Sequence, residues 1–160
     1  MKSNHFIKGL YETHLYVEDL DRSIAFYKDV LGLEQCYYEE GRRASFFWIG
    51  EANQQMLGLW EFPKDKIDKR HFAFECDAEW VINESISWLK EISIPFRNFL
   101  KDEMERAMVF TWMPAVSIYF DDPDGHSLEF IGKLDGKTFP EMGVVSYEDW
   151  LELQKQDSLD

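Results

Sequence analysis

Two histidines have the type and the spacing from which a metal site could be built. His14 lies in the run THLYVE and His71 opens the run HFAFE, and an aspartate follows each run. A single histidine on a strand is more often a packed core residue than a ligand. The pattern recurs at a spacing of 57 residues, from 14 to 71, and equivalent positions of two related modules converge near the axis between them. Two neutral imidazoles in one cavity are half of a divalent-metal site.

The third ligand is expected to be a carboxylate, and Glu129 is the best candidate. It lies in the run HSLEFIGK with an apolar residue on each side. Burying an unpaired carboxylate is costly, so a glutamate in this setting needs a partner such as a cation. His126 is three residues away and faces the other side of a regular strand, which places it outside the site.

A fourth ligand is not evident. The LEF around Glu129 corresponds to the LGL of the first half, which places Gly58 opposite Glu129, and glycine supplies no ligand. Glu61 is the nearest carboxylate. It is three residues from Gly58, so it lies on the other face of a regular strand unless a bulge intervenes. A solvent-exposed strand end is the preferred interpretation of Glu61, and substitution as a fourth ligand stays open. Three ligands with open positions are typical of catalytic metals, and two His with one carboxylate also bind non-haem iron.

The elements that must position these residues follow a repeated order of strand, helix and several strands. In the first half, residues 10–17 are expected to be a strand. A helix with Asp19 as N-cap and Gly32 as its left-handed C′ residue follows. Three further strands are expected in residues 34–40, 43–50 and 54–62. In the second half, residues 70–76 are a strand and Asp77 caps a helix. The later strands are IPFRNFL, AVSIYFDD and HSLEFIGK.

This order predicts an α+β fold in which paired βαβββ modules form a cupped mixed sheet with the helices outside. One domain is expected over residues 1–137, with modules at about 9–62 and 70–133. A helical tail is expected over 138–160, where Ser146 and Asp149 have the spacing of a capping box. Residues 101–114 have no counterpart in the first half, and a lid, a strand and a dimer contact are all open for them.

Composition excludes several classes of protein. The chain has 160 residues, of which 45% are hydrophobic, and a formal net charge of −14. This charge repels nucleic acid and anionic membranes, so neither is an expected partner. The sequence has no signal-like apolar run and only two cysteines, which indicates a cytoplasmic protein without a disulfide framework. Trp60 and Trp112 are the tryptophans that we consider for a pocket wall.

Three segments of the sequence resemble the vicinal oxygen chelate superfamily, which includes glyoxalases, dioxygenases and bleomycin-resistance proteins. These segments are THLYVEDLDRSIAFYKDVLGLE, HFAFE and SIYFDDPDGHSLEF. The resemblance covers roughly residues 9–133 and is nearest in motif to the fosfomycin-resistance thiol transferases. It implies a cavity in a cupped sheet and a divalent metal, Zn, Ni, Mn or Fe, held by His14, His71 and Glu129.

The same resemblance suggests substrate contacts. Ser117 and Tyr119 occupy positions where the fosfomycin-resistance group contacts substrate or supports the metal-bound oxygen, and parity places them on the face of Glu129. Tyr16 stands where that group usually has a small hydroxyl residue. The segment 101–114 replaces the loop that carries a cationic clamp in that group. Arg97, Lys101 and Arg106 remain cationic candidates.

The leading hypothesis is a metalloenzyme that acts on a small oxygen-bearing molecule, with Glu129 and Tyr119 as catalytic residues and the metal as a Lewis acid. Ser117, Tyr119, Tyr16 and Trp60 are the expected substrate contacts. The alternative is a metal-free protein that sequesters a drug or metabolite, as bleomycin-resistance relatives do. A homodimer is also expected. Its sequence support is an apolar surplus in the segment 101–114: Met104, Met108, Phe110, Trp112 and Met113.

Overall fold

The computed structural model describes residues 6–157, so expectations for residues 1–5 and 158–160 lie outside it. The chain divides after Lys69 into two compact units. We call the part up to Lys69 unit 1 and the part from Arg70 unit 2. Among the described residues, no helix is both long enough and apolar enough to span a membrane. Both cysteines are free thiols.

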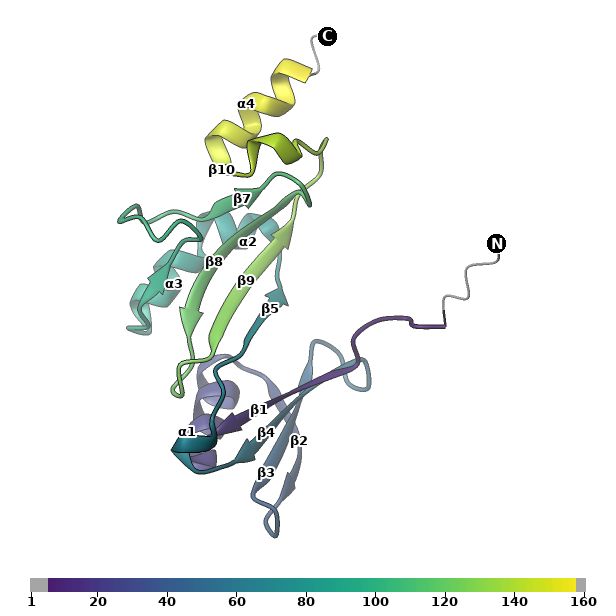
Figure 1. Ribbon diagram of the computed structural model, residues 1–160, viewed down its shortest axis with the longest axis vertical. Helices are drawn as coiled ribbons and strands as arrows, with labels where there is room; N and C mark the ends of the chain where they lie inside the picture. The colour runs from purple at the N-terminus through teal and green to yellow at the C-terminus, as the bar shows by residue number, and fades with distance from the viewer. Residues whose placement is uncertain (1–5, 158–160) are drawn as a thin grey trace. The chain divides into compact units, whose positions relative to one another are not determined.

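Unit 1 contains one mixed four-stranded sheet with a helix on one of its faces (Figure 1). The sheet order is β1-β4-β3-β2, and β1 runs parallel to β4. The elements are β1 (Glu12–Val17), α1 (Leu20–Ala25), the π-helical turn η1 (Phe26–Val30), β2 (Glu34–Glu39), β3 (Ala44–Ile49), β4 (Gln55–Glu61) and the 3-10 turn η2 (Lys64–Lys66).

The helix of unit 1 begins and ends at the residues that the sequence predicts. The Asp19 side chain accepts a hydrogen bond from the amide of Arg22 at 3.0 Å, and Gly32 has a φ of 75°. The second half of the helix differs from the expectation, because it is a π turn in which the Leu31 amide donates to the Phe26 carbonyl. A π turn adds one residue per turn and so rotates the residues that follow.

Alternation along the strands of unit 1 separates two faces. Leu15 and Val17 are buried and face α1, as do Leu57 and Leu59 of the neighbouring β4. The intervening residues of β1 and β4 therefore lie on the face opposite α1. This opposite face carries four residues that the sequence singles out: His14, Tyr16, Gly58 and Trp60.

Unit 2 repeats the connectivity of unit 1 within a larger sheet. Its order is β10-β7-β8-β9-β5, with β6 paired to β8, and the first strand β5 runs parallel to β9 as β1 does to β4. The elements are β5 (His71–Glu75), α2 (Ala78–Asn83), α3 (Ser85–Glu91), β6 (Phe96–Arg97), β7 (Met108–Phe110), β8 (Ala115–Asp121), β9 (Ser127–Lys133), the 3-10 turn η3 (Pro140–Met142), β10 (Val144–Ser146) and α4 (Tyr147–Asp157). Both units therefore show the predicted α+β fold class with mixed sheets; unit 1 has the βαβββ order, and unit 2 extends it with a second helix and an additional strand.

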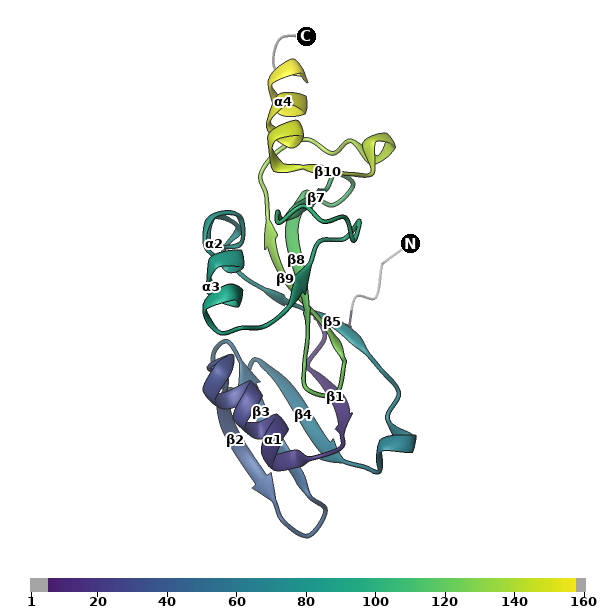
Figure 2. The same cartoon turned by 90° about the vertical axis from the view of Figure 1, so that its left-hand side faces the viewer.

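The helices α2 and α3 lie beside β8 and β9 in Figure 2. Asp77 caps α2 as predicted and accepts hydrogen bonds from the amides of Glu79 and Trp80. The single helix expected here is broken at Glu84, whose φ of −124° is not helical. Trp80 and Trp88 both pack edge-on against Phe130 of β9, which fixes both helices to the same strand.

The segment 101–114 includes the short central strand β7. β7 lies between β8 and β10, and its residues Met108 and Phe110 are buried, so they do not belong to an exposed apolar surface; the homodimer stays a prediction. Met104, Trp112 and Met113 are exposed. The predicted Ser146 cap is present: the Asp149 amide donates to the Ser146 hydroxyl, and that hydroxyl donates to the Asp149 carboxylate at 2.7 Å.

Candidate functional site

His71 and Glu129 lie next to each other in unit 2. The Nε2 atom of His71 is 3.3 Å from Oε2 of Glu129. The other ring nitrogen, Nδ1, lies 2.9 Å from the carbonyl oxygen of Ser127. Because a carbonyl accepts hydrogen bonds, Nδ1 carries the proton in the neutral ring and Nε2 presents its lone pair toward Glu129. A backbone bond of this kind is what orients histidine ligands in metal sites.

One carboxylate oxygen of Glu129 lacks a hydrogen-bond partner in the described part of the chain. The side chain is buried, and Oε1 has no hydrogen-bond partner among the described residues. A buried carboxylate without a full set of partners is costly, so it calls for a cation or a proton. A divalent cation beside Oε1, Oε2 and Nε2 of His71 would satisfy both side chains. The donor set, imidazole and carboxylate, suits Zn, Ni, Mn and Fe. These residues therefore fit the metal that the sequence predicts.

Tyr119 and Ser117 share the face of Glu129, as their parity predicts. Tyr119 pairs with Glu129 across β8 and β9, and its ring centroid is 5.7 Å from that of His71. Burial first and the Glu129 carboxylate second raise the pKa of the Tyr119 hydroxyl, so this group stays protonated at neutral pH. Ser117 is fully buried, and its hydroxyl oxygen has no partner among the residues described.

A cavity of about 420 Å³ opens beside this pair within unit 2. The residues that line it are His71, Arg97, Asn98, Phe99, Lys101, Tyr119 and Ser127. Arg97 lies opposite Tyr119 in the β6–β8 pairing and donates from Nη2 to Asp121 at 2.9 Å and to Ser127 at 2.7 Å. Arg97 and Lys101 place positive charge in a protein whose net charge is −14, so the cavity favours an anionic ligand. Arg106 does not line this cavity and pairs with Asp102.

In unit 1, His14 is held in an aromatic setting. Its ring centroid is 5.9 Å from that of Phe46 and 5.8 Å from that of Trp60. The indole Nε1 of Trp60 is buried and has no hydrogen-bond partner within residues 6–157. Tyr16 stacks on Phe62 at 4.2 Å. Aromatic rings therefore line the face of unit 1 that carries the first histidine.

The sequence patterns do not single out Glu12, although its carboxylate Oε2 lies 3.4 Å from Nε2 of His14. Glu12 precedes His14 by two residues, and residues i and i+2 of a strand share a face. The two-residue period of a strand is therefore the signal in the sequence that indicates this neighbour.

The two modules are offset by two residues relative to the match in sequence. His14 pairs with Gly58 across β1 and β4, but His71 pairs with Ser127, and Ala73 is the partner of Glu129. If His14 corresponds to His71, then Gly58 corresponds to Ser127. The prediction that Gly58 corresponds to Glu129 is therefore wrong by two residues. The faces remain equivalent, because a shift of two residues preserves the alternation of a strand.

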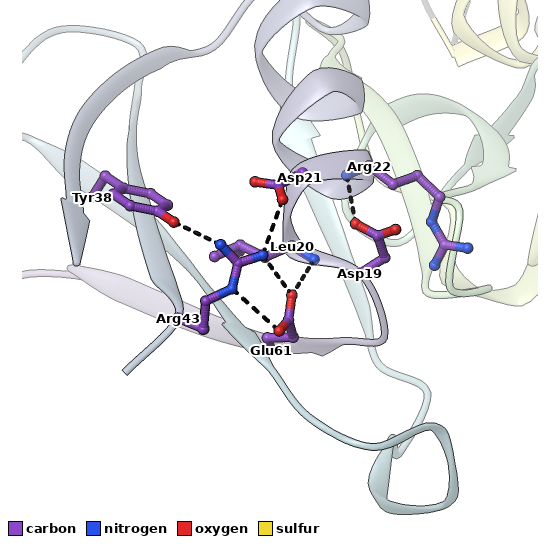
Figure 3. Close-up of polar contacts among 7 residues, drawn as sticks. All are labelled: Asp19, Leu20, Asp21, Arg22, Tyr38, Arg43 and Glu61. Atoms are coloured by element: carbon purple, nitrogen blue, oxygen red, sulfur yellow. Dashed lines mark hydrogen bonds and ion pairs between the residues drawn. The ribbon is translucent and has the colours of Figure 1, made fainter. Parts of the chain in front are cut away.

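Glu61 is used inside unit 1, as Figure 3 shows. Its Oε1 accepts from Nε of Arg43 at 3.2 Å, and its Oε2 accepts from Nη2 of Arg43 and from the Leu20 amide, each at 2.9 Å. Arg43 also donates to Asp21 and to the Tyr38 hydroxyl. Since both oxygens are occupied on the α1 face, Glu61 does not serve as the fourth ligand that the sequence left open.

This cluster predicts a pH dependence of stability. The Arg43 guanidinium, and then the Leu20 amide, hold the pKa of Glu61 below its usual value. A lowered pKa in the folded state gives a stabilisation that is present above the usual carboxyl pKa and is lost as the pH falls through the lowered one. We expect Glu61→Gln to lower the melting temperature at pH 7 and to have a smaller effect at pH 3.

The control is Glu40→Gln, which changes an exposed carboxylate in the same unit. Thermal melts of the three proteins between pH 7 and pH 3 test the expectation. A difference between wild type and Glu61→Gln that is the same at every pH would contradict it.

Unit 2 thus brings His71, Glu129, Tyr119 and Ser117 together, and unit 1 carries His14, Tyr16 and Trp60. Among the described residues, no group of three or more His, Cys, Asp or Glu side chains is placed so that it could hold a metal ion. The site of three ligands therefore stays a prediction, and His14 is the ligand that most needs a test.

Comparisons with known proteins agree with this fold. The family model described as the Glyoxalase/Bleomycin resistance protein/Dioxygenase superfamily matches residues 3–130. A metallothiol transferase FosB from Staphylococcus epidermidis is 34% identical over 115 residues, which cover 71% of this chain and 73% of the relative.

Two solved structures are also similar. An integron cassette protein from the mobile metagenome of the Halifax Harbour sewage outfall has a TM-score of 0.66 and 32% identity, over 79% of this chain and 99% of that chain. The fosfomycin resistance protein FosX from Listeria monocytogenes has a TM-score of 0.58 and 28% identity, over 78% and 90%.

The two βαβββ modules and a histidine–glutamate pair beside a cavity define a protein of the glyoxalase-like fold class. The chain belongs to the Glyoxalase/Bleomycin resistance protein/Dioxygenase superfamily. Its similarity to FosB confirms the predicted resemblance to the fosfomycin-resistance thiol transferases.

Proposed function

We propose that this protein is a metal-dependent transferase that adds a thiol to a small anionic molecule carrying a reactive oxygen. The observation that carries the proposal is the cavity of unit 2, which is lined by the cations of Arg97 and Lys101 and by His71, whose Nε2 lies 3.3 Å from the Glu129 carboxylate. A relative that is 34% identical is named a metallothiol transferase, which supports the reaction class. The first substrate to test is fosfomycin, a small phosphonate with an epoxide, because FosX is a fosfomycin resistance protein.

The metal would be held by His71 and Glu129 of unit 2, and His14 is the third ligand that the sequence predicts. A divalent cation bound there supplies Lewis acidity toward a substrate oxygen. Arg97 and Lys101 would bind the anionic group of the substrate by charge-assisted hydrogen bonds. Both bonds from Arg97 to its protein partners use Nη2, which leaves its other two guanidinium nitrogens able to donate to the ligand.

Tyr119 would stabilise the charge that develops on the reacting oxygen. In the reaction, the thiolate sulfur forms a bond to an epoxide carbon, and the bond from that carbon to the ring oxygen breaks with its electron pair going to oxygen. The oxygen then takes up the proton that the thiol released. A tyrosine whose pKa is raised keeps its proton and can donate a hydrogen bond to that oxygen throughout.

The test of the proposal is metal content together with thiol transfer. We expect protein purified without chelator to contain a divalent metal by inductively coupled plasma analysis, and His14→Ala/His71→Ala to contain none. Wild type should consume thiol in the presence of fosfomycin and a divalent metal, and EDTA should abolish that consumption. Equal metal content in both proteins would remove the metal assignment, and metal without turnover would remove this substrate.

Arg97 gives a prediction on substrate binding. Because a hydrogen bond to a charged group contributes about 1.5 to 3 kcal/mol, Arg97→Met should raise KM for an anionic substrate by roughly tenfold or more. The matched control is Lys133→Met, which removes a positive charge of the same unit from an exposed pair with Glu75. Steady-state kinetics should show an unchanged KM for the control. Equal KM values in all three proteins would show that the cavity does not bind the anion.

The alternative function is sequestration of a ligand without a metal. The aromatic face of unit 1 favours it, since Phe46 and Trp60 lie edge to face at 5.7 Å and Arg42 lies over the Trp60 ring. Such a face suits a larger, flat ligand. Calorimetry separates the two functions: binding that EDTA leaves unchanged supports sequestration, and binding that EDTA abolishes supports the metalloenzyme.

A further inference from the structure

The ring of His14 occupies space that only a glycine at position 58 leaves open. Gly58 is the partner of His14 across β1 and β4. A Cβ atom built on Gly58 would lie 2.7 Å from Cδ2 and 3.1 Å from Nε2 of His14. Real Cβ atoms essentially never approach another atom within 3.0 Å, so an alanine here would displace the imidazole.

Aromatic rings flank the imidazole within its face, and the His14 side chain is 38% exposed to solvent. Phe46 packs edge-on against it, Trp60 lies on another side, and these two rings also contact each other. The Cβ at position 58 would also lie 3.0 Å from Cε1 of Phe46. A methyl group at position 58 would therefore push the imidazole out of this face toward solvent, because Phe46 and Trp60 occupy the space beside it.

We propose that Gly58 is a positioning residue, which sets where the His14 imidazole lies and thereby whether Nε2 can bind the metal. The proposal rests on the proposed function, in which His14 is a ligand. A Cβ at position 58 would overlap the His14 imidazole.

The experiment uses Co²⁺ alone, because its visible absorption reports the number and geometry of its ligands. We expect Gly58→Ala to weaken Co²⁺ binding by roughly tenfold or more, the loss that follows when a ligand is misoriented, and to change the Co²⁺ spectrum. The matched control is Gly9→Ala, since a Cβ at Gly9 of the same unit meets no atom within 4 Å. Its affinity and spectrum should equal those of wild type. A Gly58→Ala protein that also matches wild type in both would overturn the proposal.

Thermal melts of the metal-free proteins test the steric conflict independently of the metal. Gly58→Ala should lower the melting temperature clearly in wild type and much less in a His14→Ala background, where the ring is gone. The contact of the new methyl group with Phe46 is present in both backgrounds, so its effect on the melting temperature cancels when the two losses are compared. If wild type binds no Co²⁺, the proposed function fails, and the melting temperatures alone test whether Gly58 positions the His14 ring. Equal losses in both backgrounds would then show that Gly58 does not position His14.

Discussion

Glu129→Gln is expected to abolish most of the metal affinity while leaving the fold of unit 2 intact. The substitution keeps the shape of the side chain and removes the negative charge that Oε1 and Oε2 offer. Replacing an outer residue of a metal site costs 10- to 100-fold in affinity, so loss of a charged ligand should cost roughly 100-fold or more. The buried Oε1, which has no partner among the described residues, is the structural reason to expect the effect at this residue.

Melting temperatures with and without EDTA test the expectation, since a metal that binds only the folded protein stabilises it. At 100 times the dissociation constant the stabilisation is about 2.7 kcal/mol. Wild type should therefore melt lower in EDTA, and Glu129→Gln should melt at the same temperature with and without it. A carboxylate that served only in an ion pair with His71 predicts another pattern. The variant would then melt lower than wild type, and EDTA would shift neither protein.

The short-range features of this fold follow from its sequence. Asp19 and Asp77 cap the helices where the sequence predicts, because a carboxylate before an apolar helical run accepts the free amides of the first turn. The strands end within one or two residues of their predicted bounds where turns flank them. The exception is IPFRNFL, of which only Phe96–Arg97 is a strand. Positive φ angles at Ser93 and Lys101 bend the chain on both sides of it.

The candidate site shows what the sequence does not determine. The His71–Glu129 pair follows from strand parity, but the offset of two residues between the modules depends on the pairing of β5 with β9. Arg97 reaches the cavity only because β6 pairs with β8 opposite Tyr119, a contact between residues far apart in the chain. The spacing of Arg97 from His71 or Glu129 in the sequence does not indicate that Arg97 lines the cavity. Local patterns thus indicate the neighbouring His71 and Glu129 better than they indicate the charged wall of the cavity beside them.

A second large effect is expected at Gly132, which lets a helix pack closely on the strand that carries Glu129. A Cβ on Gly132 of β9 would lie 2.4 Å from the Cα and 2.8 Å from the amide nitrogen of Ala78, the first residue of α2. The obstacle is backbone, so no side-chain rotation can relieve it, and α2 as a whole would have to move away from β9. Glycine is therefore required here for close approach.

Gly132→Ala should destabilise unit 2 by about 3 kcal/mol, the upper part of the range for overpacked cores, since a whole helix must shift. For a chain of this size that corresponds to a fall in melting temperature of roughly 6 to 12 °C. Circular dichroism melts of wild type, Gly132→Ala and the control Gly9→Ala measure it, and the control should melt like wild type. A Gly132→Ala protein that melted with wild type would show that α2 and β9 are not in such close contact in solution. In that case, close packing of α2 on β9 could not be what holds Glu129, the proposed ligand, in place.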